Sequence, residues 1–269
     1  MTYARLMGTD GPRVLAIGSC RVFRPLRKLA ADDHLTLVNA AAHESWFTHT
    51  SAAAVQYLDV VQGRREIPHE LRGAVMESPF TEWADDMSVE LPAADVVVVE
   101  VSSMKRHVVD GFHLNAHKVY GIANEGGFDY RRVVHGDTGE LPDDHRLKQM
   151  TVTPTSLAET VADVQRIEQL TGVPVVLVDH LHALTDGGVV LAGREELAAQ
   201  LRDAAAETGA TFHSTRPLIE EHGQDIALLD VNHYRDEFEI TAGKSLLTTI
   251  ESAAQVSSGS ASGRPGPQD

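Results

Sequence analysis

The single cysteine and a late Asp-x-x-His pair are the residues of this sequence best suited to nucleophilic chemistry. Cys20 stands in G-S-C, directly after the apolar run 13–18, and Asp230 and His233 stand near the other end in "LLDVNHYRDEF". A carboxylate close to a histidine can hold one ring nitrogen while the other accepts a proton from a nucleophile. A thiol activated in this way can attack an ester or thioester carbonyl. The alternative is that a lone cysteine is a small buried hydrophobe.

The elements that must position these residues follow from the apolar pattern. Short β-branched runs alternate with longer helical patterns, which favours βαβ units around a parallel sheet. We expect strands at 13–18, 35–40, 95–101, 173–179 and 210–214, and helices at 24–32, 48–62, 154–171, 194–208 and 239–255. The predicted fold is therefore α/β, with three layers built on a parallel sheet of about five strands. Val96 to Val99 should form its buried central strand.

Two helix starts are predicted from proline positions. Pro25 suits the first turn of a helix, so this helix should begin after Cys20 rather than at it. Thr153 and Pro154 suit the N-cap and first turn of the helix that stops at Gly172. A thiol near a helix N-terminus gains thiolate character, so we expect Cys20 to be reachable and more acidic than the free value of roughly 8.5.

Together, the G-S-C and D-x-x-H blocks resemble the SGNH/GDSL hydrolase superfamily. That family places its nucleophile in a G-D-S block after the first strand and its Asp and His in a D-x-x-H block near the end. Here G-S-C puts Cys20 in the nucleophile position, which is similar to the GSCFA and WcbI-like polysaccharide-biosynthesis branches. The resemblance implies an SGNH, flavodoxin-like topology, a triad of Cys20, His233 and Asp230, and acyl transfer or ester hydrolysis. Transfer is favoured because these branches act in biosynthesis.

The sequence departs from this family in its oxyanion-binding blocks. The usual G-x-N-D block reads V-E-V-S-S, so Ser102 or Ser103 would have to supply a donor beside the backbone N–H of Cys20. Ser19 is a further candidate for substrate binding, although alternation along the strand end should point it away from its neighbour. Asn39 can donate from the second-block region, but asparagine at a strand end is commonly a turn residue.

A second D-x-x-H motif offers a metal-binding alternative. Asp179, His180 and His182 follow a predicted strand, and imidazole and carboxylate suit zinc or iron. A metal-dependent hydrolase is therefore one alternative function. Adjacent strand residues point to opposite faces, so the three ligands converge only if the strand has already ended. We place the triad at Asp230 and His233, where the resemblance puts it, and expect no metal, with His182 lining the pocket.

Segment 104–150 is too polar for a core and long for a loop, which is typical of a functional lid. Lys105 and Arg106 should follow the rim of the third strand and can hold a phosphate or carboxylate. Acyl-CoA or another acyl thioester is the expected donor, and no cofactor is required. A solvated, salt-bridged face is the simpler interpretation of any single one of these residues. His113 and His117 are spaced for one helical face but lack an obvious carboxylate partner.

Composition narrows the partners and the compartment. A net charge of −16 argues against nonspecific binding to nucleic acid or anionic lipid. One cysteine excludes an intrachain disulfide framework, and the absence of a long apolar run favours the cytoplasm. We expect one domain over 1–255 with a disordered tail over 256–269. The partners should be a small-molecule acyl donor and acceptor, with homodimer formation left open. A noncatalytic small-molecule-binding protein that kept the fold is the remaining alternative.

Overall fold

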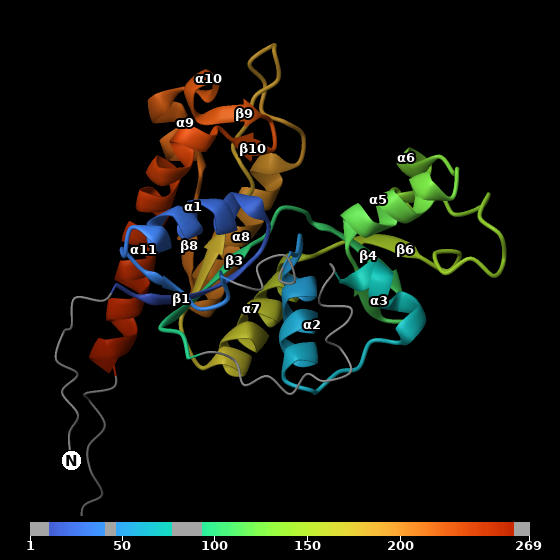
Figure 1. Cartoon of the computed structure of the whole chain (residues 1–269), viewed down its shortest axis with the longest axis horizontal. Helices are drawn as coiled ribbons and strands as arrows, with labels where there is room; N and C mark the ends of the chain where they lie inside the picture. The colour runs from blue at the N-terminus through green and yellow to red at the C-terminus, as the bar shows by residue number, and fades with distance from the viewer. Residues whose placement is uncertain (1–10, 41–46, 77–92, 261–269) are drawn as a thin grey trace, which may run out of the picture.

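Five parallel strands form the central sheet, in the order β2-β1-β3-β7-β8 (Figure 1). The computed structural model describes residues 11–40, 47–76 and 93–260. The strands are β1 (Arg13–Ile17), β2 (Thr36–Leu37), β3 (Val96–Glu100), β7 (Val175–Val178) and β8 (Thr211–His213). This strand order is that of the flavodoxin-like doubly wound sheet, whose ligands bind at the carboxyl ends of the strands. The predicted α/β fold, with a parallel sheet of five strands in flavodoxin-like order, is confirmed.

Helices cover both faces of this sheet. The α-helices of the described residues, including α5 and α6 of the second unit described below, are α1 (Cys20–Ala31), α2 (Ser51–Val61), α3 (His69–Val75), α5 (Ala116–Glu125), α6 (Tyr130–Val133), α7 (Leu157–Thr171), α8 (Arg194–Thr208), α9 (Arg216–His222), α10 (Gln224–Ala227) and α11 (Glu239–Ser260). The connection through α1 runs one way along the sheet, whereas those through α2, α7 and α8 run the other way. Because parallel crossovers are right-handed, the two directions place their helices on opposite faces. α11 packs on α1 and contacts β3, β7 and β8, which completes the α1 face.

The central strand is the one predicted from the four valines. Val96 to Val99 are all 0% exposed, because β3 lies between β1 and β7 and is covered on both faces. Val99 is paired with Ile17 on one side and Leu177 on the other. The register brings the ends of β1 and β3 to one edge, where Gly18 approaches Glu100 so closely that a Cβ on Gly18 would lie 2.6 Å from the Glu100 Cβ.

Helix α1 begins earlier than its proline indicated. Its first residue is Cys20, its N-cap is Ser19, and Pro25 lies inside the helix. The Ser19 hydroxyl accepts a hydrogen bond from the Arg21 N–H, so the cap fixes the start. Pro25 removes one backbone hydrogen bond, but burial of one helix face against the sheet and α11 offsets that cost. The fully buried residues of that face are Val22, Phe23, Leu26 and Leu29.

Two other predicted boundaries also differ. α7 starts after Ser156, which forms a reciprocal capping box with Glu159, whereas Thr153 and Pro154 belong to a strand. α11 continues through residues 256–260, where the sequence indicated a disordered tail, and residues 261–269 lie outside the described ranges. Among the described helices, none has the length and apolar character needed to cross a membrane.

The polar segment after β3 folds into a second unit beside the central sheet (Figure 1). It contains β4 (Lys105–Val109), β5 (Phe112–Leu114) and β6 (Thr151–Pro154), paired antiparallel in the order β5-β4-β6, together with α5 and α6. Val119 and Leu147 are 0% exposed and belong to the same buried apolar cluster as the strands of the central sheet. The segment therefore has regular structure of its own, and its role as a lid stays a prediction.

Candidate active site

A buried ion pair joins the ends of β1 and β3. The Ser19 hydroxyl and backbone N–H both donate to Glu100 Oε2, at 2.5 and 2.7 Å, and Arg21 Nε lies 2.6 Å from Oε1 of the same carboxylate. The Glu100 side chain is 0% exposed and that of Arg21 9%. A buried carboxylate is tolerated only when its oxygens are paired and hydrogen-bonded, as they are here. Ser19, a predicted substrate-binding residue, therefore uses its hydroxyl and backbone N–H to bind Glu100.

Cys20 lies at the N-terminus of α1, beside this ion pair. Its side chain is partly exposed, and its N–H, as the first of the helix, has no partner within α1. Burial is the main influence on the thiol and raises its pKa, while the nearby Arg21 guanidinium acts in the opposite direction. The expectation of an acidic thiol was wrong, because partial desolvation outweighs the neighbouring positive charge.

Asp230 and His233 face each other across a two-stranded hairpin. They belong to β9 (Leu228–Asp230) and β10 (His233–Tyr234), and His233 Nδ1 lies 2.9 Å from both carboxylate oxygens. This hydrogen bond lowers the pKa of Asp230. β10 packs against α1, the helix that begins with Cys20. The described hydrogen bonds of the His233 ring go to Asp230, and none joins the ring to Cys20. The Asp230–His233 pair is therefore formed, whereas a hydrogen bond between the Cys20 thiol and His233 is not.

Two arginines hold the residue that precedes His233. Arg21 Nη1 donates to the backbone oxygen of Asn232 at 3.3 Å, and Arg194 Nη2 donates to the Asn232 side-chain oxygen at 3.1 Å. Arg194 also donates to the Leu181 carbonyl at 2.5 Å, so it links the end of β7 to the hairpin. Burial lowers the pKa of Arg194 to about 10, which leaves it charged at neutral pH. No spacing in the sequence indicated this arrangement.

Asp179 stabilises the turn at the end of β8. Its carboxylate accepts hydrogen bonds from the Ser214 hydroxyl at 2.8 Å and the Thr215 N–H at 2.9 Å. Burial raises its pKa to about 6. The backbone N–H of His182 donates a hydrogen bond to Thr215 Oγ1 in the same turn. Asp179 thus holds two loops together at the sheet edge.

The proposed metal ligands do not converge. His180 Nδ1 meets the Arg194 guanidinium, a cation, whereas His182 Nε2 lies 3.9 Å from Glu220. Within the described residues, no three His, Cys, Asp or Glu side chains are grouped to hold a metal ion. His113 and His117 are also separated, since one lies in β5 and the other in α5, and not on one helical face as predicted.

Two of the predicted substrate-binding residues have other partners. The Asn39 amide accepts from the Ala16 N–H at 3.2 Å and donates to the Ala16 carbonyl at 2.7 Å. Both of its polar ends are therefore bound to the middle of β1 rather than to the rim. Arg106 forms an ion pair with Glu159 at 2.7 Å, across β4 and the start of α7. In the described contacts both residues bind the scaffold, and their role in substrate binding stays a prediction.

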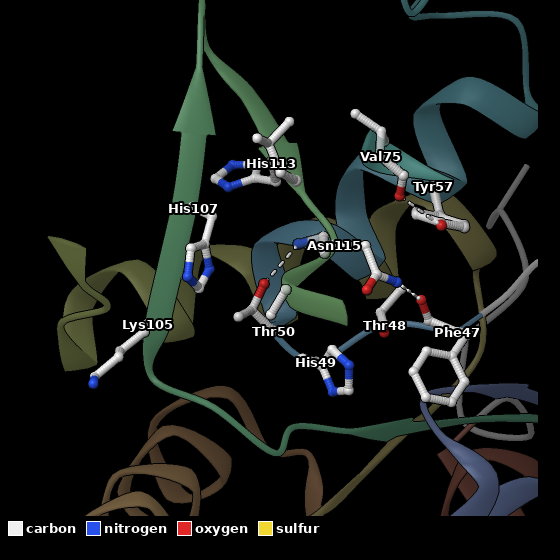
Figure 2. Close-up of a pocket in the computed structure, with 13 residues that line it drawn as sticks. Phe47, Thr48, His49, Thr50, Tyr57, Val75, Lys105, His107, His113 and Asn115 are labelled. Carbon is white, nitrogen blue, oxygen red and sulfur yellow. Dashed lines mark hydrogen bonds between the residues drawn. The ribbon is translucent and has the colours of Figure 1, made fainter. Parts of the chain in front are cut away.

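No pattern in the sequence marks His49, which lies beside the residues that follow β3. His49 Nδ1 is 2.9 Å from Ser102 Oγ, and its carbonyl accepts the N–H groups of Ser102 and Ser103 at 3.0 and 2.9 Å. Figure 2 shows its ring below Thr50, with His107 on the neighbouring strand β4. Burial lowers the pKa of His49 to about 3, so the ring is neutral. Its Nε2 is buried without a hydrogen-bond partner among the described residues.

Comparison with known families identifies relatives over most of the chain. Residues 12–132 and 129–249 match the model of the TviD N-terminal domain. The chain belongs to this family. The Vi polysaccharide biosynthesis protein TviD of Salmonella typhi is 24% identical over 274 residues, which are 87% of this chain and 31% of that protein. The chain thus spans about a third of that relative, and the predicted resemblance to polysaccharide-biosynthesis proteins is confirmed.

Solved structures with some likeness include SGNH hydrolases and esterases. A putative SGNH hydrolase from Slackia heliotrinireducens is 13% identical, with a TM-score of 0.45, and the match covers 90% of this chain and 100% of that one. Axe2, an acetylxylan esterase from Geobacillus stearothermophilus, is 9% identical, with a TM-score of 0.41, over 93% of this chain and 96% of that one. The fold itself is established by the order and direction of the five central strands.

Proposed function

We propose that this TviD N-terminal domain is an enzyme that transfers acyl groups in polysaccharide biosynthesis through Cys20, His233 and Asp230. The carrying observation is the Asp230–His233 pair, whose 2.9 Å contacts lie on a hairpin packed against the helix that begins with Cys20. Arg21 supports the arrangement, since it binds the hairpin and follows Cys20 in the chain. The name of the Salmonella typhi relative supports a polysaccharide as the acceptor.

The chemistry requires only groups that the site contains. His233 Nε2 accepts the Cys20 proton as sulfur attacks the carbonyl carbon of an acyl thioester or ester. The oxyanion forms beside the helix N-terminus, where the Cys20 N–H can donate to it. The carbon–heteroatom bond of the donor then breaks, and the leaving group takes the proton from the imidazolium. An acceptor hydroxyl attacks the resulting thioester, passes its proton to His233, and the Cys20 thiol re-forms.

Asp230 has the orienting role in this scheme. By accepting from Nδ1 it selects the tautomer whose Nε2 can receive a proton and stabilises the imidazolium. The neutral thiol indicated by its raised pKa makes base assistance necessary, because little thiolate exists at neutral pH. Water in place of the acceptor gives ester or thioester hydrolysis by the same steps. An acyl thioester such as acetyl-CoA is the donor class we propose, without a bound cofactor.

The decisive experiment traps the intermediate. The full chain is incubated with acetyl-CoA or p-nitrophenyl acetate, and the mass of the protein is then measured. Cys20→Ala and His233→Ala are the test variants. The control is His34→Ala, because His34 is exposed and lies away from the rim. We expect one acetyl group on Cys20 in the parent and control, none in Cys20→Ala, and slow labelling in His233→Ala. An unlabelled Cys20 with no turnover would instead support the noncatalytic binding protein.

A further inference from the structure

An open groove begins where β3 leaves the central sheet. It has a volume of about 540 Å³, and its lining includes Ser103, Lys105, His117, Tyr120, Val134 and His135. Ser103 is three residues beyond Glu100, so the groove opens within about 10 Å of the buried ion pair at the rim. Its other walls come from β4, α5 and the residues that follow α6. The groove therefore lies between the residues that follow β3 and the inserted unit.

The walls of this groove are held in place. Tyr120 is 45% exposed, and its ring lies 4.2 Å from that of Tyr130, which restricts its position. The backbone carbonyl of Val134 accepts a hydrogen bond from His107 Nε2 at 2.9 Å, if that nitrogen carries the proton. Both residues thus present fixed apolar surface, and a preformed pocket of this size is suited to a small ligand.

One cation is placed at the edge of the apolar surface. Lys105 Nζ lies 3.2 Å from His135 Nδ1, and Figure 2 shows it pointing away from the buried histidines. No lining residue of the groove in the described chain is acidic. Apart from its contact with His135, Lys105 has no acidic partner among the lining residues, and its remaining N–H groups can donate to ligand oxygen atoms.

We propose that this groove binds a sugar ring of the acceptor polysaccharide, and this proposal rests on the proposed function. A pyranose ring has an apolar C–H face and a rim of oxygen atoms. The apolar face fits against the exposed Tyr120 ring and Val134, while the oxygens reach Lys105 and Ser103. A donor rich in phosphate groups would need several cations, and this groove supplies one lysine. The openness of the groove at the surface also leaves room for the chain to extend on both sides of the bound ring.

The test measures binding apart from chemistry. Calorimetric titrations use the full chain carrying Cys20→Ala, with a neutral N-acetylglucosamine hexamer and a carboxylated galacturonate tetramer as the two probes. We expect at least one probe to bind, with Tyr120→Ala and Lys105→Met each weakening it roughly tenfold, which corresponds to losing one stacking or charge-assisted contact. Lys118→Met, on the same helix as Tyr120 but outside the groove lining, should bind like its parent.

The outcomes separate the two proposals. Failure of both probes to bind, or equal binding by Tyr120→Ala and Lys105→Met, overturns the groove as an acceptor site. Groove-dependent binding in a protein whose Cys20 is never acylated supports the groove and removes the proposed catalysis. Acylation of Cys20 without any groove-dependent binding supports the proposed catalysis and removes the groove as the acceptor site. A stronger effect of Lys105→Met on the carboxylated probe would identify a carboxylate as its partner.

Discussion

Replacing Arg21 with Met should destabilise the protein strongly, because it leaves the Glu100 carboxylate buried without its ionic partner. Glu100 is 0% exposed, and Arg21 Nε lies 2.6 Å from it. Removing one member of a buried pair costs about 3–5 kcal/mol. The two Ser19 hydrogen bonds remain, so we expect about 3 kcal/mol, the lower end of that range. Urea unfolding followed by circular dichroism should show the midpoint falling by about 1–3 M.

The double variant Arg21→Met, Glu100→Gln is the matched control. A neutral amide removes the uncompensated charge, so the double variant should recover a large part of the loss. A loss below about 1 kcal/mol, or no recovery in the double variant, would refute the view that this carboxylate is shielded from water.

Three further outcomes follow from the site. Asp230→Asn should lower kcat by about 10²–10⁴-fold with little change in the unfolding midpoint, because the pair is half-exposed and its role is to orient the ring; an unchanged rate in steady-state assays would exclude His233 as the base. Iodoacetamide should alkylate Cys20 more slowly at pH 7 than a free thiol does, with the rate rising at a pH above the usual thiol value, since burial raises the pKa; fast labelling at pH 7 would contradict this. Asp179 has a folded pKa raised to about 6, so its contribution to stability is present at low pH and is lost as the pH rises through about 6. Asp179→Asn should reduce that slope in urea titrations across pH 4–7, and an identical slope would mean that the carboxyl is not shielded.

The sequence predicts the central sheet well because its strands have a strong local signal. Four valines in a row have only one stable environment in a globular protein, and β3 is fully buried. Pro25 alone predicts a later start for α1 than the observed start at Cys20. A single proline costs one backbone bond, whereas Ser19 caps the helix and also binds Glu100. The second contact is long-range and leaves no mark in the local sequence.

The site was predicted in part for the same reason. Asp230 and His233 are near neighbours in the chain, so a spacing rule finds them, and the structure joins them at 2.9 Å. The residues that hold their hairpin come from positions far apart: Arg194 lies 38 positions from Asn232, and Arg21 lies 211. Such contacts depend on the order of strands in the sheet. His49 was missed in the same way, since only the fold brings it to Ser102.

The raised pKa of the thiol and the absent thiol–imidazole bond point to one order of events. A thiolate formed before substrate binding would lie close to the buried Glu100 carboxylate, which raises the thiol pKa further. A neutral thiol avoids that repulsion, and proton transfer to His233 then accompanies attack on the carbonyl rather than preceding it. The hairpin is held at Asn232, and the His233 side chain is 46% exposed, so a bound donor can approach its ring. Under this scheme, kcat/KM should not follow the thiol titration; a rate that increases through the thiol pKa would mean that the thiolate forms first.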